Sequence, residues 1–208
     1  LYLFGLAGMI MGSVHAIMEE DTRRMIAYSS VAQIGYIYMG IGLGTQAGMV
    51  AAVFHMFTHS ATKALLFISA VGLYEVSGDK KDYRSLRGAG YRNPLAGIGF
   101  AVGALSMVGF PMLAGFISKL LFATSALQSP HKMIPTLIVL AVSTILNAIY
   151  FLRLVITLYS GGGSEKKGKA SSWKLRAAIL CFILLNLVLG LKSQPVVQAI
   201  WDGLAMFD

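Results

Sequence analysis

Three titratable side chains recur at a spacing of four residues: His55, His59 and Lys63. On an α-helix, four residues advance about 400° and rise about 6 Å, so the three form one slowly turning stripe about 12 Å long. Histidine titrates near neutral pH, and a buried lysine can release its proton because burial disfavours the charged form. A stripe of this kind is typical of an ion or proton path.

The stripe lies inside a long apolar run, Gly48–Leu73. A charged side chain at the middle of a bilayer costs about 2.5–3.5 kcal/mol on insertion scales, so it is usually kept for a reason. A single intramembrane histidine is more often a packing residue than a relay, but two histidines and a lysine on one stripe favour the relay. Lys63 also lies too deep in the run to reach the headgroups easily.

The composition indicates an all-α, polytopic transmembrane bundle. Of the 208 residues, 56% are hydrophobic and 12% are charged, against about 25% charged in a soluble domain. Several apolar runs reach about 18 residues, which is enough to cross a bilayer. The net charge of +8 comes from basic residues that cluster in loops, so it carries orientation information and does not indicate nucleic acid. The lone Cys181 belongs to no disulfide framework or metal-ligand pattern.

Six spans are predicted within a transmembrane domain of residues 1–192, at about 1–18, 25–43, 46–76, 94–127, 133–159 and 173–191. Residues 193–208 form an amphipathic tail, which we expect to lie at the membrane interface. The segment 94–127 would measure about 51 Å as a straight helix, against a hydrocarbon core of about 30 Å. Gly109 and Pro111 predict a break near residues 109–112, and Lys119 follows eight residues after the proline.

Loop charge favours a single broken span over a hairpin at this point. With one crossing, twelve Lys and Arg residues in the loops 19–24, 77–93 and 160–176 share one side, while the other side has only Lys132 and Lys192. A hairpin would move the last basic loop across the membrane and remove most of this bias. The positive-inside rule therefore predicts six spans with residues 1 and 208 on the outer face.

Three segments carry a resemblance to a known family: Asp21–Gly35, Phe54–Phe67 and Leu105–Lys119. The sequence resembles the proton-translocating, antiporter-like membrane subunits shared by respiratory complex I, membrane-bound hydrogenases and Mrp-type Na⁺/H⁺ antiporters. Family members contain two inverted repeats. The resemblance implies that the six spans are the second repeat plus a final helix. Because the sequence begins within an apolar run and without Met, we expect the N-terminal half of the subunit to be missing.

The resemblance also implies roles for individual residues. Lys119 matches the family's key lysine in the broken helix, and Lys63, His59 and His55 match the central polar line that leads to it. Two positions depart from the family's usual pattern, with Arg23 where lysine is frequent and Met112 where a second proline is common. The absent first repeat would carry the family's Glu–Lys pair and the other half of the channel.

The mechanism that we expect is proton hopping along Lys63, His59, His55 and Lys119, joined by water and by hydroxyl groups, namely those of Thr58, Thr62 and Ser118. Redox energy elsewhere in the complex would drive it in complex I relatives, and a proton gradient would drive sodium export in antiporter relatives. Three further residues stay ambiguous: Arg153 is as much a membrane anchor as a relay, Glu75 is interfacial or pairs with a neighbouring subunit, and His15 is undecided. No nucleotide fingerprint, iron–sulfur cysteine pattern, flavin site or metal-ligand spacing occurs, so we expect no cofactor and no redox chemistry in this chain.

Two other classes of membrane protein are alternatives. A structural membrane scaffold would keep the spans without a proton path, and a solute carrier would need a substrate pocket that the sequence does not indicate. Within the favoured class, the histidine stripe looks slightly closer to Mrp-type subunits than to complex I or hydrogenase subunits, and the choice stays open. The expected partners are other membrane subunits, the lipid bilayer, protons and, in antiporters, Na⁺. The expected location is a bacterial or archaeal cytoplasmic membrane.

Overall fold

A computed structural model describes residues 1–161 and 172–207, so most of the predicted basic linker lies outside the described residues. The described part is helical and contains no strand. Its α-helices are α1 (Tyr2–Met18), α2 (Thr22–Gly42), α3 (Gln46–Glu75), α4 (Ala89–Arg92), α5 (Pro94–Val108), α6 (Ala114–Ala126), α7 (Pro130–Leu158), α8 (Trp173–Leu191) and α9 (Gln194–Leu204), followed by a 3₁₀ turn, Ala205–Phe207.

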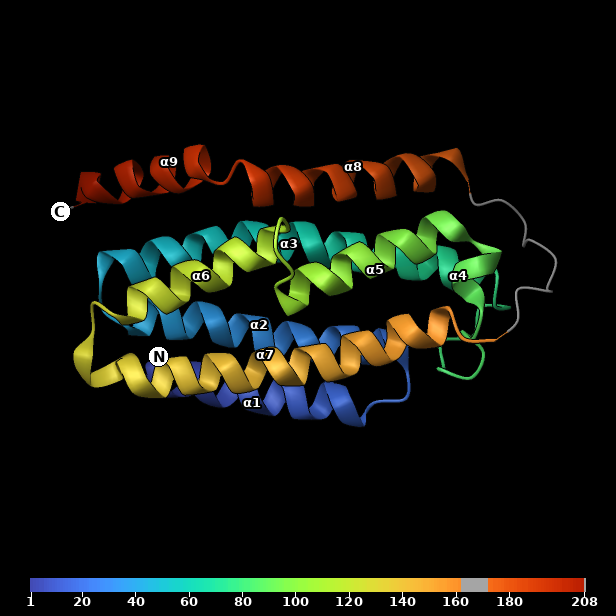
Figure 1. The fold of residues 1–208 in the computed structure, drawn as a ribbon, viewed down its shortest axis with the longest axis horizontal. Helices are drawn as coiled ribbons and strands as arrows, with labels where there is room; N and C mark the ends of the chain where they lie inside the picture. Colours follow the sequence, from blue (N-terminus) through green and yellow to red (C-terminus); the bar gives the residue numbers. More distant parts are fainter. Residues whose placement is uncertain (162–171, 208) are drawn as a thin grey trace.

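The long helices lie along one axis, and both ends of the chain are at the same end of the bundle (Figure 1). α3 occupies the middle and contacts α2, α5, α6, α8 and α9. α5 and α6 follow one another nearly end to end along this axis (Figure 1). α9 continues beyond α8 in the same direction, and its Val196 packs against buried Ala61 and Leu189. The helix that carries His55, His59 and Lys63 is therefore surrounded by other helices.

Three helices of the described residues are long and apolar enough to cross a membrane: α3, α7 and α8. α1, α5 and α6 are apolar but shorter. α2 has 21 residues, and its buried face carries polar side chains such as Ser29 and Gln33, which lower its hydropathy. These helices agree with the membrane protein predicted from composition. Helix length alone does not fix the number of spans.

Small residues let α1 and α2 approach closely. Gly12 packs against Ala32, and a Cβ at Gly8 would lie 3.5 Å from Gly35 Cα. Small-residue faces of this type replace the hydrophobic effect as the basis of helix association in lipid. The glycines of α1 therefore lie against a specific partner, the middle of α2.

The loop 77–93, expected to be a solvated face, is folded against the bundle. Leu86 is fully buried, and Arg92 donates hydrogen bonds to the carbonyls of Val76 (3.1 Å) and Ser85 (3.3 Å). The Thr22 N–H donates to Lys81 O at 2.9 Å, which ties this loop to the start of α2. The sequence could not reveal this arrangement, because Arg92 bonds mostly to backbone carbonyls, together with the Ser77 hydroxyl at 3.1 Å.

The chain between α5 and α6 makes a tight turn. Gly109 has a φ of 95°, and the N–H groups of Gly109 and Phe110 donate to Ser106 O (3.0 Å) and Leu105 O (2.9 Å), which is the Schellman pattern of a helix C-terminus. Met112 also has a positive φ, of 73°. α8 closes over this turn, because a side chain at Gly190 would collide with the Met112 carbonyl.

Gly109→Ala should destabilise the protein more than Gly44→Ala. Both glycines have positive φ, which costs an L-residue about 1–2 kcal/mol. At Gly109 the new Cβ would also lie 3.0 Å from the Lys119 Cδ, whereas nothing lies within 4 Å at Gly44. The midpoint of thermal unfolding of the purified full-length subunit in its complex measures the difference, and equal shifts for the two variants would contradict this account.

Candidate functional site

Lys119 is held at the junction between α5 and α6. Its Nζ donates hydrogen bonds to the carbonyl of Val108 (2.8 Å) and to Thr144 Oγ1 on α7 (3.0 Å), and lies 5.8 Å from the centre of the Tyr36 ring. Val108 is the last residue of α5, so its carbonyl has no partner within the helix and sits at the negative end of the helix dipole. The turn thus creates the acceptor that fixes this lysine.

His55 and His59 face one another along α3. Their rings are stacked with centroids 6.0 Å apart, and His55 also packs against Tyr36 (5.5 Å) and Phe122 (5.4 Å). His55 Nδ1 and Ser118 Oγ are hydrogen-bonded at 2.6 Å, so α3 connects directly to the residue before Lys119. Neither Nε2 atom has a hydrogen-bond partner among the described residues. The two imidazoles, four residues apart on α3, therefore lie near Lys119 of α6.

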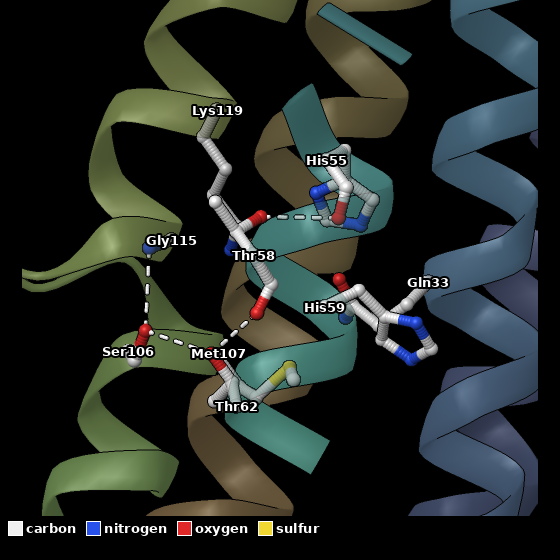
Figure 2. A pocket seen from close by; sticks show the side chains of 9 residues that line it. All are labelled: Gln33, His55, Thr58, His59, Thr62, Ser106, Met107, Gly115 and Lys119. Atoms are coloured by element: carbon white, nitrogen blue, oxygen red, sulfur yellow. Dashed lines mark hydrogen bonds between the residues drawn. The ribbon is translucent and has the colours of Figure 1, made fainter. Parts of the chain in front are cut away.

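A small cavity lies among these groups (Figure 2). Its volume of about 10 Å³ is close to that occupied by one water molecule. It is lined from α2, α3, α5 and α6 by Gln33, His55, Thr58, His59, Thr62, Ser106, Met107, Gly115 and Lys119. On the other side of Lys119, a larger apolar hollow of about 500 Å³ extends between α6 and α7. The cavity brings both histidines and one lysine to a shared, water-sized space.

Lys63 is buried, with 6% of its surface exposed, but its ammonium group turns toward α2. It donates to the Ile26 carbonyl at 2.8 Å and to the Ser29 hydroxyl, and it lies 5.8 Å from the centre of the Phe151 ring. It does not line the cavity that His55 and His59 share. The third member of the stripe is thus anchored on the α2 side of the bundle.

A buried amide network was not predicted from the sequence. Asn186 of α8 accepts hydrogen bonds from Thr62 (2.7 Å) and Ser106 (3.0 Å), and Ser106 in turn accepts from the Gly115 N–H (3.2 Å). Four helices, α3, α5, α6 and α8, meet in these contacts. The one available signal was an asparagine in the apolar run of α8, because a polar group in lipid needs a protein partner.

The remaining candidates lie away from the cavity. His15 is exposed, with Nδ1 hydrogen-bonded to Met11 O at 2.8 Å and its ring stacked on Tyr28. Arg153 is exposed and lies over the Tyr83 ring at 4.6 Å, and Glu75 is exposed at the last turn of α3. Thr58 lines the cavity, and its hydroxyl donates to the His55 carbonyl at 3.1 Å. The structure therefore groups His55, His59, Thr58, Thr62, Ser118 and Lys119, and separates them from His15, Glu75 and Arg153.

The helical bundle, its membrane-spanning helices and the lysines and histidines inside it define an integral membrane protein with ionisable groups in its interior. The profile of one family, described as NADH:quinone oxidoreductase/Mrp antiporter, TM, matches residues 1–147. The chain belongs to this family, which confirms the resemblance seen in the sequence.

Similar proteins come from both branches of the family. The chain is 31% identical over 199 residues to NADH-quinone oxidoreductase subunit L of Buchnera aphidicola, covering 94% of this chain and 32% of that protein. It is 36% identical over 206 residues to subunit N of Desulforudis audaxviator, covering 92% and 40%. In the Mrp complex of Dietzia sp., a chain of 24% identity has the same fold with a TM-score of 0.86, covering 95% of this chain and 45% of that one. The chain thus spans less than half of each of these proteins.

Asn186→Leu should destabilise the bundle by about 1–3 kcal/mol, because it leaves the buried Ser106 hydroxyl without its acceptor. The Thr62 hydroxyl keeps a second acceptor, the Thr58 carbonyl at 2.7 Å. Cys181→Leu, on the exposed face of the same helix, is the matched control and should have little effect. Thermal unfolding of the detergent-solubilised complex gives both values. Asn186→Leu with wild-type stability would mean that the network contributes nothing to holding α8.

Proposed function

We propose that this chain is the proton-conducting half of an antiporter-like membrane subunit, with Lys63, His59, His55 and Lys119 as its proton-binding groups. The observation that carries the proposal is that, among the described residues, the ammonium groups of both lysines donate to neutral acceptors, from Ile26, Ser29, Val108 and Thr144. A neutral acceptor stabilises an ammonium group less than a carboxylate does. When a lysine bound to neutral acceptors releases its proton, no unpaired carboxylate is left behind in the bundle.

The histidines supply the link between the lysines. Ser118 bonds to His55 on one side and precedes Lys119 in the chain, while the stacked His59 extends the line along α3 toward Lys63. The cavity beside them has room for about one water molecule, which could join the two Nε2 atoms to the lysine. A structural scaffold would have no use for imidazole nitrogens that are buried without protein partners, so the scaffold reading is not favoured.

We propose six spans, with α5 and α6 together forming one interrupted crossing. α5 has 15 residues and α6 has 13, so they measure about 22 and 20 Å and neither crosses a core of about 30 Å alone. The loop contacts support this topology. Thr22 N–H donates to Lys81 O, which places the first two basic loops together, while Lys132 Nζ donates to Gly42 O at 2.8 Å at the opposite end. A hairpin at Gly109 would bring Lys132 to the basic end.

The remaining parts of the proposal follow from family membership. The six spans are the second inverted repeat and a final helix, in a transmembrane domain of residues 1–192 with an interfacial tail at 193–208. Other membrane subunits of a respiratory or antiporter complex supply the driving force, and the transported ion is the proton, exchanged for Na⁺ in an antiporter. The sequence relatives are named NADH-quinone oxidoreductase subunits, and a chain of an Mrp complex, at 24% identity, shares the fold. The proposal includes both memberships. The proposed location is a bacterial or archaeal cytoplasmic membrane.

Lys63→Arg in the full-length subunit should abolish proton transport while the complex still assembles, because arginine keeps its proton under all physiological conditions. Lys119→Met should do the same by removing the titratable group. Proton uptake by vesicles that contain the purified complex measures both. Lys132→Arg, which changes an end-of-helix anchor outside the path, is the control and should transport normally. Transport at the wild-type rate by Lys63→Arg would refute a protonation role for Lys63.

The topology predicts labelling from opposite faces. In a Cys181→Ala background, Asp79→Cys and Gln128→Cys lie in loops at the two ends of the bundle, and both positions are exposed. A membrane-impermeant thiol reagent should reach position 128 from the outer face and position 79 from the cytoplasmic face. Labelling of both from one face would contradict an interrupted single crossing.

A further inference from the structure

Two helices carry the same polar pattern on facing sides. α2 has serine, glutamine and tyrosine at relative positions 0, 4 and 7, and α7 has serine, asparagine and tyrosine at the same offsets; these residues are Ser29, Gln33, Tyr36, Ser143, Asn147 and Tyr150. Offsets of four and seven residues lie on one helix face. All six side chains are fully buried or nearly so. Each helix therefore turns a polar stripe into the bundle.

The stripes begin at Lys63. Its ammonium group donates to the Ser29 hydroxyl. The Tyr150 hydroxyl of α7 lies near Ser29 and Ser13 and donates a hydrogen bond to Asn147 Oδ1. From the lysine of α3, hydroxyl and amide groups thus continue onto α7.

The stripes end at Lys119. The Tyr36 hydroxyl lies near Ser143, Thr144 and Asn147 of α7, and the Thr144 hydroxyl accepts a hydrogen bond from Lys119 Nζ at 3.0 Å. Three groups at this end, Tyr36 OH, Ser143 Oγ and Asn147 Nδ2, are buried and have no hydrogen-bond partner among the described residues. Together they offer the two to four polar partners that an internal water molecule requires.

We propose that these residues form a second proton route between Lys63 and Lys119, which contains no histidine and runs beside the His59–His55–Ser118 line. The route passes through Ser29, Tyr150, water held by Asn147, Tyr36 and Thr144. It rests on the proposed function, because both lysines must exchange protons. Phenylalanine and leucine would fill the same space in lipid without unsatisfied polar groups, so packing alone does not explain these side chains.

The transfer balances with water as the only added reactant. The Lys63 ammonium releases a proton to the Ser29 oxygen, and each hydroxyl or water accepts a proton on one side and releases its own on the other. The last proton reaches the neutral amine of Lys119, and rotation of the hydroxyl groups resets the chain. Asn147 does not relay a proton. It is a positioning residue whose Oδ1 holds Tyr150 and whose Nδ2 faces the bridging water.

Tyr36→Phe tests the route, because it removes the hydroxyl and keeps the ring that stacks on His55. The matched control is Tyr38→Phe, two residues further along α2 and 43% exposed. Both are made in the full-length complex, alone and combined with His55→Gln, which can hydrogen-bond but cannot titrate. We expect Tyr36→Phe and His55→Gln each to lower the proton transport rate several-fold, and the double variant to lose it. Tyr38→Phe should leave the proton transport rate unchanged, both alone and combined with His55→Gln.

The outcomes separate this route from the proposed function. Wild-type transport by Lys63→Arg, measured in the same vesicles, would mean that the proposed function itself fails. If Lys63→Arg is inactive but Tyr36→Phe transports at the rate of its parent in both backgrounds, the second route is overturned. Complete loss in either single variant would also overturn it, since two parallel routes leave residual transport. Co-purification of the partner subunits and an unchanged thermal midpoint distinguish loss of transport from loss of folding.

Discussion

The hydrogen bond from Lys119 to the Val108 carbonyl is the interaction on which the centre of this bundle depends. Ending a helix inside an apolar environment exposes carbonyl groups that water would otherwise satisfy. The Schellman turn at Gly109 satisfies two of them, from Leu105 and Ser106, and the ammonium group eleven residues away satisfies Val108. In return, the negative end of the α5 dipole and the Thr144 hydroxyl stabilise a half-buried cation that has no carboxylate among these partners. The end of α5 thus supplies an acceptor for Lys119, and Lys119 supplies a donor for the end of α5.

Several other features follow from this junction. α6 begins so close to α5 that Gly115 donates to Ser106, and α8 covers the turn because Gly190 has no side chain to keep it away from Met112. Asn186 then reaches the hydroxyls of Thr62 and Ser106 from the covering helix. This brings α3, with its histidines, against the start of α6, where Ser118 bonds to His55. His55, Ser106, Asn186 and Lys119 are each positioned by a partner on a different helix.

The sequence predicted what depends on local spacing and composition. A period of four residues placed His55 and His59 in a stack, and the apolar runs gave helix bounds close to those of α1, α3, α7 and α8. It did not predict the direction of Lys63, because a long flexible side chain can leave its helix stripe for the nearest acceptors, here on α2. The Asn186 network and the anchoring of Arg92 were missed for a related reason. The partners of Asn186 come from distant helices. Most partners of Arg92 are backbone carbonyls, whose positions depend on how the loop folds.

The distribution of hydrogen bonds separates structural polar groups from groups suited to transport. Many hydroxyls donate to carbonyls one turn earlier in their own helix, as Ser13 does to Met9 and Ser125 to Phe122, so they are satisfied without any partner from another helix. Six of the ten buried groups that lack a hydrogen-bond partner among the described residues lie on the two proposed routes or beside them, on His55, His59, Gln33, Tyr36, Ser143 and Asn147. The other four are on Thr22, Ser69, Tyr74 and Tyr83. A bundle stabilised by packing alone would minimise such groups, since each carries a desolvation cost. The six groups near Lys63 and Lys119 suit the hydrated connection proposed between these lysines, and the packing of the surrounding helices does not require them.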